Sequence, residues 1–329
     1  MRNISFNEFI HAHIGYWKNF FNMVKLMKKN YKNSNQILIK IFTNNYPINA
    51  ELKSGEKILL QTFQSMYFKL FADNFNYIHY DFKKDIVEIE KIDSNNSTKD
   101  IKIFGGVNNG DIINGFLGKD YRDINVKDKT VIDVGANIAD TPIFFVCLGA
   151  KKVIGIEPFP KNFSLAQKNI EQNQMNEKIK MINAGCSSTK GFIRIDSDVF
   201  DTTSTISSSS NGQEIPLITI NEIIQDHQIR DNAILKIDCE GCEYDIIKNM
   251  EKNIFQKFSE IFIEYHNGYQ DLRKVLENQG FSVNVSNPIA TNVLNTIFGL
   301  FRKNKNKQRI GYVGFIHATM NFDQKKIES

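Results

Sequence analysis

Long apolar runs and abundant cysteine are both missing from this sequence of 329 residues. No stretch of about 18 uncharged apolar residues occurs, so the sequence predicts no membrane-spanning helix. Four cysteines, two of them in one CxxC, are too few for a disulfide framework and favour a reducing, cytoplasmic location. The first 30 residues lack the apolar core and the small-residue cleavage site of a signal peptide.

A strong charge of either sign is missing too. The 41 basic and 37 acidic side chains leave a net charge of only +4, which does not by itself indicate a nucleic-acid partner. The hydrophobic share of 41% and the charged share of 24% are typical of an ordinary globular protein. These values exclude a largely disordered chain.

The chain is organised around Lys129–Ala150, with the sequence KTVIDVGANIADTPIFFVCLGA. Its β-branched start predicts a strand buried on both faces of a parallel sheet. Gly135 permits a tight turn, and we expect Asp140 to cap the helix that follows. A second apolar run, Val153–Ile156, ends on Glu157. Strand, turn, helix, strand and terminal acid together indicate a nucleotide- or nucleoside-binding βαβ unit.

Polar groups close four of the predicted strands. They are Asp133, Glu157, Asp238 and the pair Glu264 and His266. An acid at the end of a buried strand loses hydration unless a ligand or partner compensates. Because ligands bind at the carboxyl ends of parallel strands, we expect these groups to share one crevice.

The glycine turn distinguishes two classes of cofactor. A nicotinamide dinucleotide needs G-x-G-x-x-G, but here Asn137 and Asp140 replace the second and third glycines after Gly135. Asp140 would also direct a negative charge at the pyrophosphate. S-adenosylmethionine carries no phosphate, and its ribose hydroxyls suit a carboxylate such as Glu157. The sequence therefore favours S-adenosylmethionine.

Five segments together resemble the FkbM-type S-adenosylmethionine-dependent methyltransferases. They are VIDVGANIADT, IGIEPFPKN, INAG, LKIDCEGCEYDII and IFIEYHNG, within residues 104–285. The resemblance implies an α/β fold, namely a class I (Rossmann-like) methyltransferase with a seven-strand doubly wound sheet. It also implies O-methylation of a hydroxyl on a sugar, glycolipid or polyketide-like acceptor. A dinucleotide-dependent oxidoreductase and a non-catalytic cofactor- or carbohydrate-binding homologue are the alternatives.

The resemblance also implies roles for individual residues. Those expected to hold the methionine end of the cofactor are Asp133, Gly135, Ala136 and Asn137. Glu157 would bind the ribose diol, and Asn183 or its neighbour the adenine edge. Those expected to face the methyl group and the acceptor are Asp238, Glu240, Glu264 and His266. The family turn reads GANxG, whereas Ala139 stands at the glycine position here; at a positive φ its methyl would cost on the order of 1 kcal/mol.

An alcohol needs a base before it attacks a methyl group, and His266 is the first candidate because of its near-neutral pKa. Glu264 would orient it, while Glu240 and Asp238 are rivals for the base. The same four side chains could ligate Mg or Mn, but the sequence does not favour a metal. Cys239 and Cys242 are expected to be packing thiols. Base methylation of nucleic acid is disfavoured, because IDCE lacks the proline–aromatic segment that holds a flipped base.

Two parts of the chain are expected. Residues 1–128 form an N-terminal helical and short-strand addition that caps the acceptor side, and residues 129–329 form the methyltransferase core. The N-terminal helix has an aromatic face, for which packing on the core is favoured over peripheral membrane contact. Residues 202–210 are interpreted as a mobile loop. The basic stretch 302–309 is interpreted as a solvated loop rather than a membrane-edge patch. No oligomeric state is predicted.

Overall fold

The computed structural model describes residues 4–43, 45–90, 100–109, 112–118, 121–195, 212–291, 293–294, 296 and 310–320. The predictions for residues 202–210 and 302–309 lie outside these residues. Within the described ranges, no helix has both the length and the apolar character needed to cross a bilayer. The cytoplasmic location stays a prediction.

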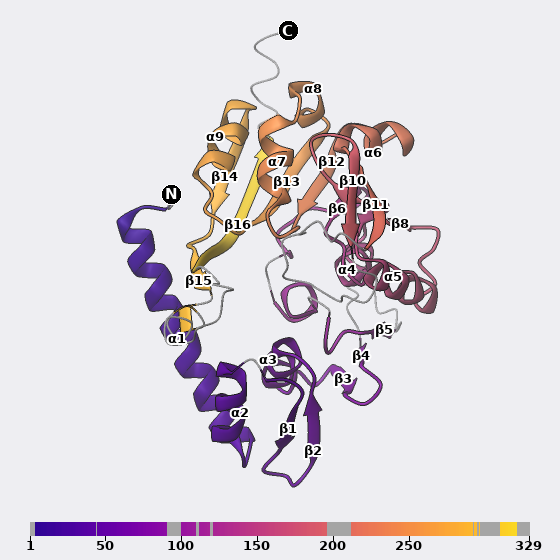
Figure 1. Cartoon of the computed structure of the whole chain (residues 1–329). Coiled ribbons are helices and arrows are strands. Elements are labelled where there is room, and N and C mark those ends of the chain that lie inside the picture. The colour runs from indigo at the N-terminus through magenta and orange to yellow at the C-terminus, as the bar shows by residue number, and fades with distance from the viewer. Residues whose placement is uncertain are drawn as a thin grey trace.

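The largest sheet has seven strands in one continuous order. That order is β14 (Phe281–Val285), β16 (Gly311–Met320), β13 (Phe258–Tyr265), β12 (Ala233–Ile237), β6 (Thr130–Val134), β7 (Lys152–Ile156) and β8 (Ile179–Ile182). The pairs from β13 to β8 are parallel, whereas β16 runs antiparallel to both of its neighbours. A short strand, β15 (Ile289–Thr291), also pairs with β16. The predicted α/β fold with a seven-strand sheet is confirmed (Figure 1).

Helices cover both faces of this sheet (Figure 1). They are α4 (Asp140–Cys147), α5 (Pro160–Gln172), α6 (Ile220–Asp226), α7 (Cys242–Asn249), α8 (Lys252–Phe255) and α9 (Gln270–Asn278). Consecutive residues of β6 belong to different hydrophobic clusters, Val131 to the one with Phe144 and Ile132 to the one with Leu272. This is why the strand reads as a continuous apolar run.

The N-terminal region consists of short elements. They are α1 (Phe6–Asn30), α2 (Ser34–Phe42), β1 (Ile48–Glu51), β2 (Lys57–Leu60), α3 (Phe63–Ala72), β3 (Ile78–Asp81), β4 (Ile86–Ile89), β5 (Ile101–Phe104) and the π-helix η1 (Ile113–Leu117). Val87 and Ile103, on β4 and β5, share a hydrophobic cluster with Val131 of the large sheet. The addition is therefore packed directly onto the core.

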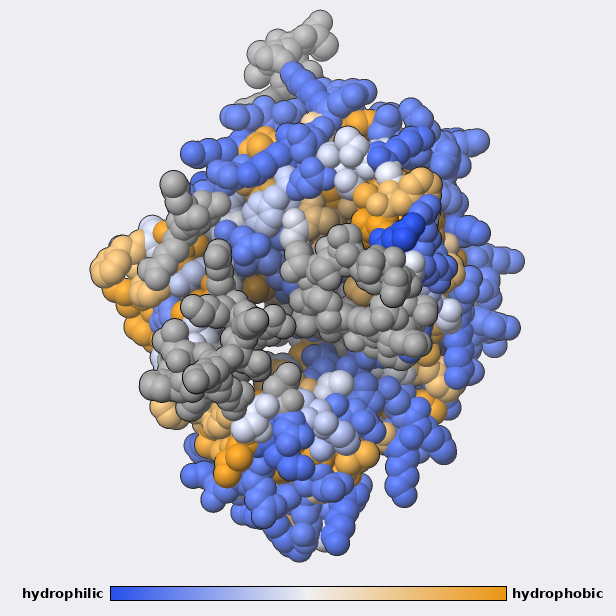
Figure 2. Space-filling model, viewed as in Figure 1, coloured by the Kyte–Doolittle hydropathy of each residue, from blue (hydrophilic) through white to orange (hydrophobic). Residues whose placement is uncertain are grey.

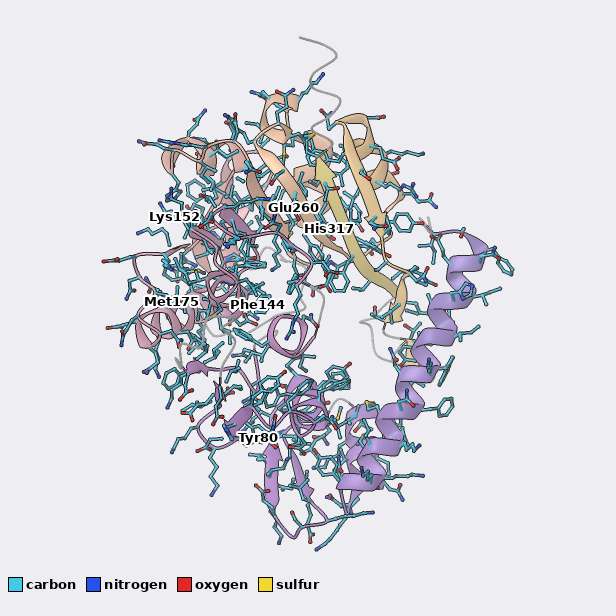
Figure 3. The ribbon with its side chains drawn as sticks, turned by 180° about the vertical axis from the view of Figure 1, so that it is seen from behind. Tyr80, Phe144, Lys152, Met175, Glu260 and His317 are labelled. Carbon is cyan, nitrogen blue, oxygen red and sulfur yellow. A yellow bond between two sulfur atoms is a disulfide. The ribbon has the colours of Figure 1, made fainter. Side chains whose placement is uncertain are left out.

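A smaller sheet joins β9 (Gly185–Cys186), β10 (Gly191–Ile195) and β11 (Gln213–Ile218). In this sheet β10 and β11 are antiparallel. In the large sheet, Glu260 of β13 accepts a hydrogen bond from Lys129 Nζ (3.1 Å). Its other carboxylate oxygen is hydrogen-bonded to His317 Nε2 of β16 (2.9 Å). Figure 3 shows Glu260 and His317 on these neighbouring strands.

The start of α4 differs from the prediction. Asp140 is the first helical residue, and the N-cap is Ala139, whose side chain cannot cap a helix. Ala139 has φ 66° and is fully buried in the hydrophobic core. The left-handed conformation of this alanine destabilises the fold by about 1 kcal/mol, and burial of its methyl group offsets part of that loss.

Candidate active site

A cavity of about 270 Å³ opens at the carboxyl ends of β6, β7, β12 and β13. Four of its lining residues were predicted from the sequence to meet there, namely Glu157, Asp238, Glu240 and Glu264. Gly135 and Asn137 of the glycine turn line it as well. The N-terminal region contributes Gln64, Asn109 and Asn114. The cavity is therefore built from both predicted parts of the chain.

Gly135 makes the approach of two strand ends possible. Its φ is 80°, and a Cβ built there would lie 1.7 Å from the backbone carbonyl oxygen of Asp238. No side chain fits in that distance, so the residue must be glycine for Asp238 to hold its position.

We expect Gly135→Ala to lower the free energy of unfolding by about 2–5 kcal/mol, which combines left-handed strain with overpacking. Urea denaturation followed by circular dichroism measures the loss. Gly55→Ala is the matched control, because Gly55 has φ 97° with open space around the built Cβ, and should cost about 1–2 kcal/mol. Equal losses in the two variants would contradict the close approach at Gly135.

Glu157 is a buried carboxylate held by backbone donors. The N–H of Asn137 donates to its Oε2 and the N–H of Phe159 to its Oε1, both at 2.9 Å. The residue is 4% exposed, and burial raises the pKa of its carboxyl to about 7. The side chain is thereby fixed at the end of β7 with its remaining acceptor capacity available to the cavity.

Asp133 lies behind the cavity. It is fully buried, its Oδ1 lies 2.9 Å from Lys236 Nζ, and Thr141 Oγ1 donates to its Oδ2 at 2.5 Å. Lys236 itself lines the cavity, donates to the carbonyl of Gly135 (3.2 Å) and lies 3.9 Å from Asp238 Oδ2. Asp133 therefore acts on the site through Lys236, which was missed in the sequence.

Two other predicted binding residues also lie behind the lining. Ala136 is fully buried, and its N–H donates to Ile156. Asn183 Nδ2 donates to the carbonyls of Glu157 (2.9 Å) and Pro158 (3.1 Å), so its amide braces the chain that follows β7. After Asn183, the cavity is lined by Gly185 and Cys186, and the adenine assignment stays a prediction.

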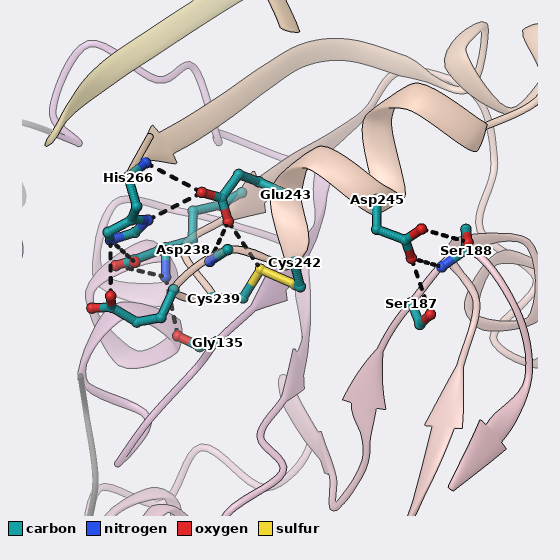
Figure 4. The surroundings of a disulfide bond; sticks show 12 residues. Gly135, Ser187, Ser188, Asp238, Cys239, Cys242, Glu243, Asp245 and His266 are labelled. Carbon is teal, nitrogen blue, oxygen red and sulfur yellow. Dashed lines mark hydrogen bonds and ion pairs between the residues drawn. A yellow bond between two sulfur atoms is a disulfide. The ribbon is translucent and has the colours of Figure 1, made fainter. Parts of the chain in front are cut away.

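His266 lies among carboxylates (Figure 4). Its Nδ1 is 3.1 Å from Glu243 Oε1. On the other side, its Nε2 lies 3.4 Å from Glu240 Oε2, 3.8 Å from Glu264 Oε1 and 4.0 Å from Asp238 Oδ1. The four residues predicted to face the acceptor are thus brought together, and Glu243 of α7 is added to them.

The ionisation of this cluster differs from the expected one. Burial alone would lower the pKa of His266, but hydrogen bonds and charges from Glu240 and Glu243 raise it to about 11. Burial raises the pKa of Asp238, against the opposing charges of Lys236 and His266. His266 is consequently an imidazolium at neutral pH and has no free lone pair for a substrate proton. Asp238, its rival, is therefore the base that we propose.

Cys239 and Cys242 form a disulfide at the start of α7 (Figure 4). The prediction of packing thiols is wrong here, because the strand-to-helix turn brings their Cα atoms to 5.5 Å, an ordinary spacing for a disulfide. Both residues line the cavity. The buried Cys186 is not part of a disulfide.

Three of the site residues can also meet a metal ion. Asp238, Glu264 and His266 each offer one ligand atom, and these atoms all lie within 4.8 Å of one another. Two carboxylate oxygens and one imidazole nitrogen suit Mg or Mn. An ion bound there would replace the proton on the imidazolium of His266, and the sequence does not favour a metal.

Residues 133–283 match the family model described as the methyltransferase FkbM domain. This confirms the resemblance seen in the sequence, and this part of the chain is a methyltransferase domain. A curated relative, hexuronic acid methyltransferase AglP of Haloferax volcanii, is 24% identical over 163 residues, or 49% of this chain and 66% of that protein. The match thus spans just under two thirds of that relative.

Two further similarities were found. Uncharacterized protein 158B of Sulfolobus islandicus rod-shaped virus 1 is 26% identical over 159 residues, covering 47% of this chain and 74% of that protein. The structure of M. capricolum TrmK in complex with S-adenosyl-homocysteine is 16% identical, covers 60% of this chain and 65% of that one, and has a TM-score of 0.37.

Proposed function

We propose that the FkbM methyltransferase domain of this chain uses S-adenosylmethionine to methylate a hydroxyl of a carbohydrate or glycolipid acceptor. The observation that carries this proposal is the single cavity into which Glu157 and the acids Asp238, Glu240 and Glu264 converge. A positively charged cofactor without phosphate suits such an acidic site.

The residues at the β7 end of the cavity fit a nucleoside. Glu157 offers carboxylate oxygens to the two ribose hydroxyls. Asn162 also lines the cavity, is 1% exposed, and has an Oδ1 without a hydrogen-bond partner among the described residues. A buried acceptor of this kind is costly unless a ligand supplies the donor. We assign it to a hydroxyl or amino group of the bound nucleoside.

The glycine turn disfavours the alternative dinucleotide. Asn137 and Asp140 line the cavity beside Gly135. A pyrophosphate would meet the carboxylate of Asp140 at the helix start, where dinucleotide-binding folds place backbone N–H groups and no acid.

The acceptor side of the cavity carries amide side chains. Gln64 of α3, Asn109 and Asn114 of η1 come from the N-terminal region, which we propose to be the acceptor-side cap. Amides donate and accept hydrogen bonds at once, as hydroxyl groups do, so they suit a polyhydroxylated ligand. The curated relative that is named a hexuronic acid methyltransferase supports a sugar acceptor.

When bound, the cofactor supplies an electrophilic methyl group for an in-line displacement. The residues of this chain align the acceptor and remove its proton. Asp238, with its raised pKa, takes the proton of the hydroxyl. His266 and Lys236, at 4.0 Å and 3.9 Å from its two oxygens, hold that carboxylate in place as fixed positive charges.

Isothermal titration calorimetry tests the cofactor assignment. We expect S-adenosylhomocysteine to bind and NAD to give no heat, and Glu157→Ala to weaken binding about 100-fold, since hydrogen bonds to a charged acceptor contribute about 1.5–3 kcal/mol. The pKa of about 7 adds a pH signature, because the ligand binds the ionised form. Affinity should be constant above pH 7 and fall about tenfold per unit below it. Binding of NAD instead would overturn the proposal.

A further inference from the structure

Helix α1 has two apolar faces. One contains Phe9, Ala12 and Tyr16 and packs against Ala290 and Tyr312 of the C-terminal strands, with Ala12 fully buried. The predicted packing of the aromatic face on the core therefore holds for Phe9, whereas Phe6, Ile10 and Phe21 of that face are exposed. It accounts for only part of the apolar surface of the helix.

The second face is open to solvent. It consists of Phe6, Ile10, Ile14 and Phe21, which are 76%, 39%, 59% and 63% exposed. The spacings of four, four and seven residues place these side chains in one stripe along the helix. In Figure 2, hydrophobic residues gather at the left edge of the molecule, where Figure 1 places α1. We call these four residues the outer stripe.

Positive charge accompanies the outer stripe. The helix contains four lysines, Lys18, Lys25, Lys28 and Lys29, all exposed, and one acid, Glu8. Glu8 is engaged in the capping box with Ser5 and accepts a hydrogen bond from Tyr269. At 100° per residue, Lys18, Lys25 and Lys29 lie along one edge of the stripe and Lys28 continues its line. The outward face therefore combines apolar anchors with uncompensated positive charge.

We propose that α1 is a docking surface for a membrane that contains anionic lipids, with the helix lying in the plane of the interface. An apolar stripe edged by lysines is the pattern that binds such surfaces, through buried apolar area and attraction to acidic headgroups. A second copy of this chain fits less well, because it would bring two lysine-bearing faces together. The docking does not depend on the proposed methyl transfer, but it would bring the enzyme to acceptors carried on lipids.

The test uses the full chain and its single tryptophan, Trp17, which lies on α1. Vesicles of phosphatidylcholine alone are compared with vesicles that also contain phosphatidylglycerol, by co-sedimentation and tryptophan emission. We expect binding and a blue shift with the anionic vesicles only, both weakened by added salt. Phe21→Glu and the pair Lys25→Glu with Lys28→Glu should each reduce the partition coefficient about tenfold or more.

The matched control is Phe192→Glu. Phe192 is 68% exposed, as Phe21 is 63% exposed, but it lies on β10. This variant should bind vesicles like the unaltered protein. Three results would overturn the proposal: equal binding to neutral vesicles, equal loss in Phe192→Glu and Phe21→Glu, or a dimer in sedimentation velocity that Phe21→Glu dissociates. The last result would assign the stripe to a second copy.

Discussion

Replacing Asp238 with asparagine is expected to lower kcat by about 10²–10⁴-fold, while the affinity for S-adenosylhomocysteine changes little. The amide keeps the size of the side chain but cannot take the acceptor's proton, and general-base assistance contributes about this factor. Steady-state kinetics with a sugar acceptor and calorimetry with the cofactor product give the two numbers. Because burial raises the pKa of Asp238, kcat of the unaltered enzyme should fall as the pH drops through that pKa.

Glu240→Gln is the matched control for this experiment. Glu240 also lines the cavity and lies closer to His266 than Asp238 does, so the variant removes a neighbouring carboxylate and keeps the carboxylate of Asp238. It should keep kcat within about tenfold of the unaltered enzyme. A large loss of kcat in Glu240→Gln with a small loss in Asp238→Asn would identify Glu240 as the base instead. A loss of turnover on adding EDTA would instead assign Asp238 to a metal ion together with Glu264 and His266.

The meeting of acids in one cavity could be predicted because it follows from topology. Parallel strands end at the same edge of a sheet, so Glu157, Asp238 and Glu264 were expected to converge once β7, β12 and β13 had been identified. The glycine turn could be predicted as well, since Gly135 lies within the βαβ unit, but its close approach to Asp238 at the end of β12 could not. Which strand end each of these residues occupies is a local property of the chain.

The partners of these residues could not be predicted, because they depend on register and on packing across the fold. Lys236 is the register neighbour of Asp133 on the adjacent strand, and the two side chains form a buried ion pair. The sequence did contain a sign of this ion pair, because a lysine inside the apolar strand ILKI needs a buried acidic partner. Glu243 reaches His266 from α7, and Glu240 and Glu243 together raise the pKa of the imidazole to about 11. Ala139 likewise shows its left-handed conformation only in the folded turn.

Because His266 is ionised in the folded protein, we expect the free energy of unfolding to fall as the pH rises into the alkaline range. Its pKa is raised above the ordinary value of 6.5 to about 11, so the folded state binds a proton that the unfolded chain releases. The stabilisation is complete below pH 6.5 and is lost as the pH rises toward 11. Glu243 is fully buried and also accepts from the N–H groups of Gly241 (2.8 Å) and His266 (3.2 Å). Breaking a buried pair of this kind costs about 3–5 kcal/mol.

The expected result is a difference between the unaltered protein and His266→Gln in the free energy of unfolding. That difference should be largest near pH 6 and shrink steadily between pH 7 and 10, measured by urea denaturation at each pH. Taking the difference from the variant cancels the contributions of the lysines and tyrosines that titrate in the same pH range, because both proteins contain them. Nuclear magnetic resonance of the imidazole then reports the proton directly: His266 should show no titration near pH 6.5, whereas Glu243→Gln should bring its pKa down toward that value. A midpoint near 6.5 in the unaltered protein would restore His266 as the base, because its lone pair would then be free at neutral pH.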